Sequence, residues 1–375
     1  MKESVPLYEA CDYIVDCEHR TAPIDESGDF FAVGTPAMRD GVIDFSQARR
    51  ISKETFMKWT RRLAPRHGDL LFAREAPVGP LVRIPIEENV APGQRTVLMR
   101  PNPEVVNSTF LFYLLGSPVV QRRVLERAAG STVAHLNVAD IRAFELPPLP
   151  GLETQCAIAE VLGALDDKIA ANRKLATTAD ALATSLFARL DNVNSPAELM
   201  GEVLSLEYGK ALPASQRVHG LSAVYGSGGV VGSHNESLLE GPAVIVGRKG
   251  TIGAVHWSNG PCFPIDTTFF VRPNSERVTL EYCYYLLRSL DWADFNSDSA
   301  VPGLNRSQAL KRKVLMPSIR EIERFTSDVQ PLLKLQESVD SESMSLVAMR
   351  DTLLPPLMSG ELRVRDAERV VENVL

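Results

Sequence analysis

The stretch AIAEVLGALDDKIAANRKLATTADALATSLFARL, residues 157 to 190, decides the architecture of this chain. Its apolar residues recur mostly at alternating spacings of four and three, which places them along one side of a single long helix. We therefore expect a helix with a seam that another part of the protein must cover. The seam residues are Ile158, Leu162, Leu165, Ile169, Asn172, Leu175, Ala179, Leu182, Leu186 and Leu190.

A second seam of the same kind runs from Ile322 to Leu353 near the end of the chain. Two helices of about 35 residues would each extend about 50 Å, and neither seam is apolar enough throughout to be stable alone. Packing the seams together buries both, so we expect an antiparallel coiled coil. Prolines at 147, 148, 150 and 317 precede the two helices and indicate domain boundaries. The alternative is that each helix belongs to an ordinary compact domain.

The parts of the chain ahead of the two helices are copies of one unit. The offset between matching stretches drifts only from 174 to 168 residues, and the matches keep their order. A self-similarity of this length indicates one structural unit used twice. The matching pairs are GDLLFAREAPVG (68–79) with VIVGRKGTIG (244–253), VLMRPN (97–102) with FFVRPN (269–274), FLFYLLGS (110–117) with YCYYLLRS (282–289), and STVAHLN (131–137) with SAVPGLN (299–305).

Between the proline breaks, the sequence is typical of short strands, tight turns and a few helices. The runs AVIVG (243–247) and TFFVRP (268–273) are β-branched or aromatic, whereas TLEYCYYLLRSL (279–290) has helical apolar spacing. The sequence therefore predicts a mixed α/β (α+β) fold with two strand-rich globular domains, two long helices and a pseudo-two-fold internal repeat. The expected segments are 1–146 for the first globular domain, 147–198 for the central helix and linker, 199–317 for the second globular domain, and 318–375 for the distal helix and tail.

The net charge of −7 conceals an uneven distribution of charge along the chain. Basic and acidic residues nearly balance in 1–146 (18 against 19) and in 199–317 (11 against 10), and the deficit lies in 147–198 (4 against 7) and 318–375 (7 against 11). Within the first globular domain, RRISKETFMKWTRRLAPR (49–66) carries seven basic residues and one acid, with Phe56 and Trp59 interleaved. Such a segment is typical of a surface that contacts phosphate groups. The alternative is a solvated helix face.

Several classes of protein are disfavoured by what the sequence lacks. No run approaches the roughly 18 to 20 apolar residues of a membrane span, and no signal peptide is recognisable, so we expect a cytoplasmic protein. Five cysteines without a CxxC pair and six histidines without HxxxH or HExxH spacing predict neither disulfides nor a bound metal. The loop GRKGTIG (247–253) lacks the spacing of a phosphate cradle or a dinucleotide fingerprint. We therefore expect a non-catalytic chain without a cofactor of its own.

Three stretches give the chain a resemblance to a known family. In LPPLPGLETQCAIAEVLGALDDKIAANRKL (146–175), the portion ALDDKI…NRKL resembles the central spacer helix of the specificity subunits of type I restriction-modification enzymes. GRKGTIG…DTTFFV in the second copy and LLPPLMSGELRV (353–364) extend the likeness over essentially the whole chain. One departure is visible, because the family often has Glu-Gln-Arg where this chain has Thr154, Gln155 and Cys156. Only Gln155 is matched.

The resemblance implies a subunit that binds double-stranded DNA and reads a bipartite target, with one target-recognition domain for each half and an unread spacer between them. It also implies partner subunits. Two copies of a modification subunit would bind S-adenosylmethionine and methylate adenines, and a restriction subunit would use ATP and Mg²⁺ to translocate and cleave DNA. Neither S-adenosylmethionine nor ATP nor Mg²⁺ is expected in this chain.

Candidate DNA-contacting residues follow from the basic segment and from the loops that the two copies share. Arg74 and Arg248 occupy the same position in the two copies, so either residue could instead be a framework ion-pair partner. Glycines in these loops are more readily explained by turns that need a positive φ. The candidates are Lys53, Lys58, Arg61, Arg62 and Arg74 in the first copy, and Ser227, Gly228, Arg248, Lys249, Thr251, Asn305 and Arg306 in the second.

The outward face of the central helix is a candidate docking surface for the modification subunits. It is expected to present Asp166, Asp167, Lys168 and Arg173. The alternative is a polar face that is merely solvated. Two other functions stay open: a duplicated scaffold that binds protein and not DNA, which the acidic total favours, and an enzyme with an unfamiliar active site.

Overall fold

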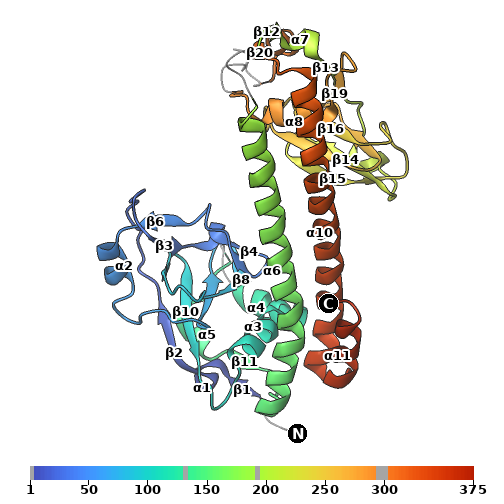
Figure 1. Cartoon of the computed structure of the whole chain (residues 1–375). Helices are drawn as coiled ribbons and strands as arrows, with labels where there is room; N and C mark the ends of the chain where they lie inside the picture. Colours follow the sequence, from blue (N-terminus) through green and yellow to red (C-terminus); the bar gives the residue numbers. More distant parts are fainter. Residues whose placement is uncertain (1–3, 130–133, 191–194, 293–302) are drawn as a thin grey trace. The chain divides into compact units, whose positions relative to one another are not determined.

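The computed structural model describes residues 4–129, 134–190, 195–292 and 303–375 (Figure 1). The chain divides into two compact units, Met1–Ile169 with Met344–Leu375, and Ala170–Ser343. Each unit contains one strand-rich globular part and a section of each of two long helices, α6 (Leu152–Ala188) and α10 (Ile319–Ser359). Residues 131–133 and 299–302 of the matched repeat stretches, and residues 192–194 of the expected linker, lie outside the described residues.

The first unit is built on an antiparallel four-stranded sheet with the order β2-β10-β7-β8. Strand β7, in the interior of this sheet, is apolar at successive positions because both faces of the sheet are covered. Leu70 and Phe72 face a core shared with the helices, whereas Leu71 and Ala73 face a smaller core beneath a second sheet. That second sheet has the order β6-β3-β9, with β3 and β9 parallel. The strands are β2 (Cys11–Asp16), β7 (Leu70–Arg74), β8 (Val78–Arg83), β10 (Thr96–Pro101), β3 (Phe30–Val33), β6 (Arg49–Ile51) and β9 (Val90–Pro92).

The second unit repeats these two sheets strand for strand. Its four-stranded sheet has the order β13-β19-β16-β17, and its three-stranded sheet, β15-β14-β18, again contains one parallel pair, β14 with β18. Val244 and Val246 of the central strand face the main core, and Ala243 and Ile245 face the smaller one. The predicted internal repeat and α+β class are therefore confirmed at the level of topology. The strands are β13 (Leu204–Tyr208), β14 (Ser222–Gly226), β15 (Gly229–His234), β16 (Ala243–Gly247), β17 (Val255–Ser258), β18 (Cys262–Pro264) and β19 (Thr268–Pro273).

Some of the short elements around the sheets are repeated as well. In both copies a two-residue or three-residue strand pairs with a strand just ahead of the long helix, β1 with β11 and β12 with β20. The first unit has these further elements: β1 (Val5–Pro6), α1 (Leu7–Ala10), β4 (Met38–Arg39), β5 (Val42–Ile43), α2 (Lys53–Trp59), α3 (Ser108–Gly116), α4 (Pro118–Ala128), α5 (Val138–Arg142), β11 (Glu145–Leu146) and α11 (Val364–Glu372). The second has β12 (Ala197–Leu199), α7 (Met200–Val203), α8 (Leu280–Arg288), α9 (Arg306–Leu310) and β20 (Lys313–Leu315).

The two long helices pack antiparallel, as predicted. In the first unit the beginning of α6 shares a core with the end of α10, through residues such as Leu162 and Leu353. In the second unit the end of α6 meets the beginning of α10, where the rings of Phe187 and Phe325 lie 5.6 Å apart in a T-shaped arrangement. Asn172, in the middle of α6, donates a hydrogen bond of 2.8 Å to Glu342 of α10.

One part of the predicted seam is wrong. Leu175 and Leu182 are 42% and 49% exposed, and the buried positions after Asn172 are Ala179, which the predicted seam includes, and Ala183, which it does not. The predicted seam takes two successive steps of three residues, from Ile169 to Asn172 and on to Leu175, whereas the observed seam keeps the alternation of threes and fours and continues from Asn172 through the half-buried Ala176. Leu175 and Leu182 each lie one position ahead of this seam, so their side chains point outward.

None of the helices within the described residues is long and apolar enough to cross a membrane.

Candidate nucleic-acid interface

In each copy, the turn after the central strand is joined to the segment that leads into a short helix. The amide of Leu136 donates to the carbonyl of Arg74 at 2.9 Å, and the amide of Leu304 donates to the carbonyl of Arg248 at 2.9 Å. A single antiparallel β-bridge extends each junction. It pairs Glu75 with His135 in the first copy and Lys249 with Gly303 in the second. The candidate residues around Arg248 and those near Asn305 are therefore brought together, as a common recognition loop requires.

The helix that follows each junction begins with an asparagine cap. The side chain of Asn137 accepts a hydrogen bond from the amide of Asp140, and that of Asn305 accepts one from the amide of Gln308 at 3.1 Å. Capping of this kind satisfies a helix amide that has no partner within the helix. In the free protein, the side-chain oxygen of Asn305 is thus engaged in capping α9.

Around the second junction, Ser227 connects the glycine-rich loop to the arginine turn. Its hydroxyl group donates to the carbonyl of Thr267 at 2.5 Å and accepts from the amide of Lys249 at 3.4 Å. The Ser227 side chain is buried, whereas Gly228, Lys249 and Thr251 are exposed. The structure therefore places these four candidates in one cluster, in which Ser227 positions the loop and the other three form its surface.

Arg248 lies against aromatic rings at the edge of this cluster. Its Cζ atom is 4.9 Å from the ring centroid of Tyr208 and 5.8 Å from that of Phe269, and its Nη1 donates to the carbonyl of Asp266 at 3.1 Å. Arg306, the first residue of α9, has its Cζ atom 5.7 Å from the same Tyr208 ring. Tyr208 was not among the candidates, because its own stretch of sequence carries no recognisable motif.

Arg74, the matching residue of the first copy, is enclosed. The residue is 9% exposed; its Nε lies 3.3 Å from a carboxylate oxygen of Asp16, and its Nη1 donates to the carbonyl of Leu136 at 3.3 Å. Its Nη2 lies 3.4 Å from Nδ1 of His19. Because arginine can only donate, Nδ1 of His19 accepts in this contact, and its Nε2 lies 2.9 Å from a carboxylate oxygen of Asp16. This placement fits the alternative in which Arg74 is an ion-pair partner within the protein framework.

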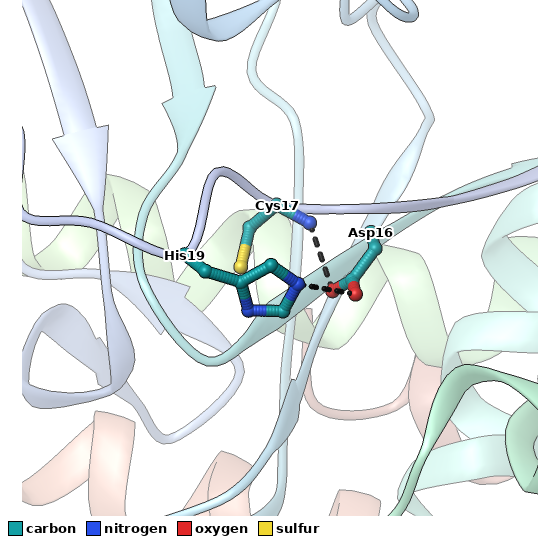
Figure 2. Close-up of side chains that lie close together, drawn as sticks. All are labelled: Asp16, Cys17 and His19. Carbon is teal, nitrogen blue, oxygen red and sulfur yellow. Dashed lines mark hydrogen bonds and ion pairs between the residues drawn. The ribbon is translucent and has the colours of Figure 1, made fainter.

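Asp16, Cys17 and His19 form the only group of three metal-ligating side chains found in the described part of the chain (Figure 2). Asp16 accepts hydrogen bonds from the Cys17 amide at 3.0 Å and from His19, and the Arg74 guanidinium lies beside it. Burial raises the pKa of the Cys17 thiol, which favours the protonated form that does not bind metal. The neighbouring cation and the protonated thiol both disfavour a metal ion, and the cluster is accounted for as the holder of Arg74.

The four candidates of the basic segment (49–66) lie on helix α2 or directly after it. Ser52 caps α2 by accepting from the amide of Thr55, and Lys53 and Lys58 of this helix are exposed. Arg61 forms an ion pair with Glu18 at 2.9 Å, and Arg62 donates to the carbonyl of Asp16 at 3.2 Å.

The aromatic residues of the basic segment are part of the core. Phe56 stacks on Phe30 with ring centroids 4.4 Å apart, and Trp59 is 7% exposed. They stabilise α2, and stacking on bases would require them to leave this core.

The expected outward face of the central helix needs one correction. The Asp166 side chain points into the first unit, where it accepts from the Tyr113 hydroxyl at 2.6 Å and pairs with Arg350 of α10 at 2.7 Å. Asp167 and Arg173 are exposed and Lys168 is half-buried. A helix turns 100° per residue, so the neighbouring Asp166 and Asp167 point in different directions, Asp166 inward and Asp167 outward.

Comparisons with known proteins agree with this architecture. Residues 23–179 match the family model described as "Type I restriction modification DNA specificity domain". The chain is 24% identical over 376 residues to the type I restriction enzyme MjaIX specificity subunit of Methanocaldococcus jannaschii, covering 85% of this chain and 83% of that protein. It is 26% identical over 282 residues to a putative type I specificity subunit of Mycoplasma pneumoniae, covering 68% of this chain and 74% of that protein.

A solved structure has the same fold. The crystal structure of the S subunit of a type I restriction-modification system from M. genitalium superimposes with a TM-score of 0.65 and covers 95% of each chain. The sequence identity in this superposition is 19%, so the comparison bears on the fold.

Proposed function

Because this chain belongs to the specificity-subunit family of type I restriction-modification systems, we propose that it reads a bipartite DNA target for such a complex. Each strand-rich part reads one half-site, and the bases between the half-sites go unread. The reading uses hydrogen bonds to base edges, while contacts to phosphate fix the register of the protein on the duplex. The chain itself performs no catalysis.

The observation that carries the proposal is that the two copies share one backbone framework but differ in the side chains of the loop on it. Both copies join the arginine turn to the segment ahead of a capped helix by the same backbone hydrogen bond. On this framework the first copy has Glu75, Ala76 and Pro77 where the second has Lys249, Gly250 and Thr251. Equal frameworks with unequal side chains suit a protein that reads two different half-sites.

The long helices suit the role of a spacer. At 1.5 Å per residue, the 37 residues of α6 extend about 55 Å, which exceeds the roughly 34 Å of one DNA turn. Half-sites one turn apart would be accessible from one side of the duplex. The acidic balance of the helical segments is explained if the spacer is held away from the phosphates.

The partners and cofactors in this proposal belong to other chains. Two copies of a modification subunit bind S-adenosylmethionine and methylate adenines, and a restriction subunit uses ATP and Mg²⁺ to move and cleave DNA. Asp167, Lys168 and Arg173 of α6 are the proposed docking residues for the modification subunits, and Asp167 and Arg173 are exposed. Asp166 is engaged within the protein and is left out of this set.

The proposal is tested by coexpressing the chain with its native modification subunit in a host without adenine methylation and mapping methylated adenines across the genome. We expect a two-part motif with a fixed gap. Exchange of residues 199–317 for those of a related chain should change one half of the motif only. A soluble, associated complex that methylates no site would overturn the proposal and favour the scaffold alternative.

A further inference from the structure

The strand register shows that Asp16 and Tyr208 occupy the same position in the two copies. Asp16 of β2 faces Val97 of β10, and Tyr208 of β13 faces Phe269 of β19. Val97 and Phe269 each follow a threonine that faces the residue just before the shared arginine, Thr96 with Ala73 and Thr268 with Gly247. The shared arginine is therefore held by a carboxylate in the first copy and by an aromatic ring in the second.

This exchange changes the charge that each arginine offers to solvent. Asp16 compensates the charge of Arg74 and helps to enclose it. A tyrosine ring attracts a guanidinium group through its π electrons but adds no negative charge. Arg248 therefore remains a net cation, and Tyr208, which is 51% exposed, holds it near the surface.

A second cation lies on the same ring. The Cζ atoms of Arg248 and Arg306 are 4.9 and 5.7 Å from the Tyr208 centroid, so they are at most 10.6 Å apart, the sum of these distances. Among the ion pairs formed by the described residues, none involves either arginine. Two uncompensated positive charges at this separation repel each other, and an anion between them would relieve the repulsion.

We propose that Tyr208 holds Arg248 and Arg306 as a clamp for one backbone phosphate of DNA beside the second half-site. The inference rests on the proposed function and adds a residue, Tyr208, that no motif marks. A phosphate fits better than a base edge, because the arginine position is common to both copies and cannot by itself distinguish two half-sites. Arginine also matches the planar, bidentate geometry of phosphate recognition. The first copy has no counterpart of this clamp, since Asp16 compensates the charge of Arg74.

The test measures DNA binding by the complete complex of this chain with its modification subunits. Affinities for a target duplex and for an unrelated duplex are recorded over a series of salt concentrations for the wild type, Arg306→Gln, Tyr208→Asp and Tyr208→Phe. Loss of one phosphate contact lowers the slope of log affinity against log salt by about 0.9. We expect that loss, on both duplexes, for Arg306→Gln and for Tyr208→Asp, which installs the carboxylate of the first copy. Tyr208→Phe keeps the ring and should behave as the wild type.

Arg272→Gln is the matched control, because Arg272 is also an exposed arginine over an aromatic ring on β19, with its Cζ 5.4 Å from Phe270. Its slope should stay that of the wild type. Thermal unfolding of every variant confirms that it is folded. If the wild type shows a steep slope and Arg306→Gln matches it, the clamp is refuted while the proposed function stands. If Arg306→Gln changes the preferred bases of the second half-site instead, Arg306 reads a base and the phosphate clamp is refuted. A wild type without salt-dependent DNA binding refutes the proposed function itself.

Discussion

The hydroxyl group of Tyr113, on α3, donates a hydrogen bond of 2.6 Å to Asp166 of α6, and Asp166 also pairs with Arg350 of α10 at 2.7 Å. One carboxylate thus connects the globular part of the first unit to sections of both long helices. Burial raises the pKa of Tyr113, and the neighbouring Asp166 charge raises it further, so the phenol stays a donor at neutral pH. The contact defines how α6 packs within this unit.

Asp166→Ala should lower the free energy of unfolding by about 2 kcal/mol, because the buried Tyr113 hydroxyl loses its acceptor and Arg350 loses one partner. The neighbouring Asp167→Ala is the control, and a change within about 0.5 kcal/mol is expected there because Asp167 is exposed. Chemical denaturation of the two variants measures both effects. Equal stabilities of the two variants would contradict the packing role of Asp166.

Gln155 should be the most sensitive residue at the start of α6. It is 1% exposed, accepts from the Asn107 amide at 2.9 Å, and donates to the carbonyls of Pro150 and Val105 at 2.9 and 3.2 Å. Gln155→Ala leaves these backbone groups without partners, so the free energy of unfolding should fall by about 2 to 3 kcal/mol. The exposed Thr154→Ala should have little effect, and a thermal unfolding series compares the two.

The sequence predicted the repeat, the two helices and the grouping of the second-copy loop residues, because periodicity and matching stretches report directly on framework. Of the family pattern at the start of α6 only Gln155 is retained, and Gln155 is the residue whose buried hydrogen bonds connect this part of the helix to Asn107 and Pro150. The inward placement of Asp166 was not predicted, because two adjacent acidic residues on a helix are typical of a solvent-exposed face. Its partner Arg350 lies 184 positions away in the sequence.

The correspondence of Asp16 and Tyr208 could not have been predicted from the sequence. The two residues have no chemical likeness. In the first copy, Arg100 and Pro101 of β10 face Tyr13 and Cys11 of β2, so β2 carries one extra residue, Asp12, that β13 of the second copy does not have. A single bulged residue shifts which side chain faces the arginine. Only the paired strands show which positions are equivalent.

Gly253 and Gly250 form a matched pair for testing the arginine turn of the second copy. Both have positive φ, +73° and +83°, but a Cβ on Gly253 would lie 2.2 Å from the Trp292 ring, whereas a Cβ on Gly250 would meet nothing within 4 Å. Gly250→Ala should cost about 1 kcal/mol of backbone strain alone. Gly253→Ala should cost at least about 3 kcal/mol, because the buried Trp292 must move. Denaturant titration of the two variants measures the difference, and equal costs would contradict the close approach of Trp292.

The cysteines should differ sharply in reactivity. Cys156 is half-buried and the other four are buried. Burial raises the pKa of the Cys11 and Cys283 thiols to about 12, so both stay protonated and unreactive at pH 8. A thiol reagent at pH 8 should modify one cysteine in the native protein and all five after denaturation, and Cys156→Ser should abolish the native reaction. Rapid native modification of Cys283 would contradict its enclosure.

The two shared arginines should separate stability from DNA binding. Arg74→Gln leaves the half-buried Asp16 carboxylate without its charge partner, so the free energy of unfolding should fall by about 2 to 4 kcal/mol. Arg248→Gln removes a cation from an exposed ring and a single carbonyl contact, so the change in stability should stay within about 1 kcal/mol. DNA affinity should respond in the opposite order, with Arg248→Gln lowering the salt slope by about 0.9 and Arg74→Gln leaving it unchanged wherever the protein is folded. Denaturation and binding measured on the same preparations decide the matter, since a loss of slope in Arg74→Gln would show that the enclosed arginine reaches DNA after all.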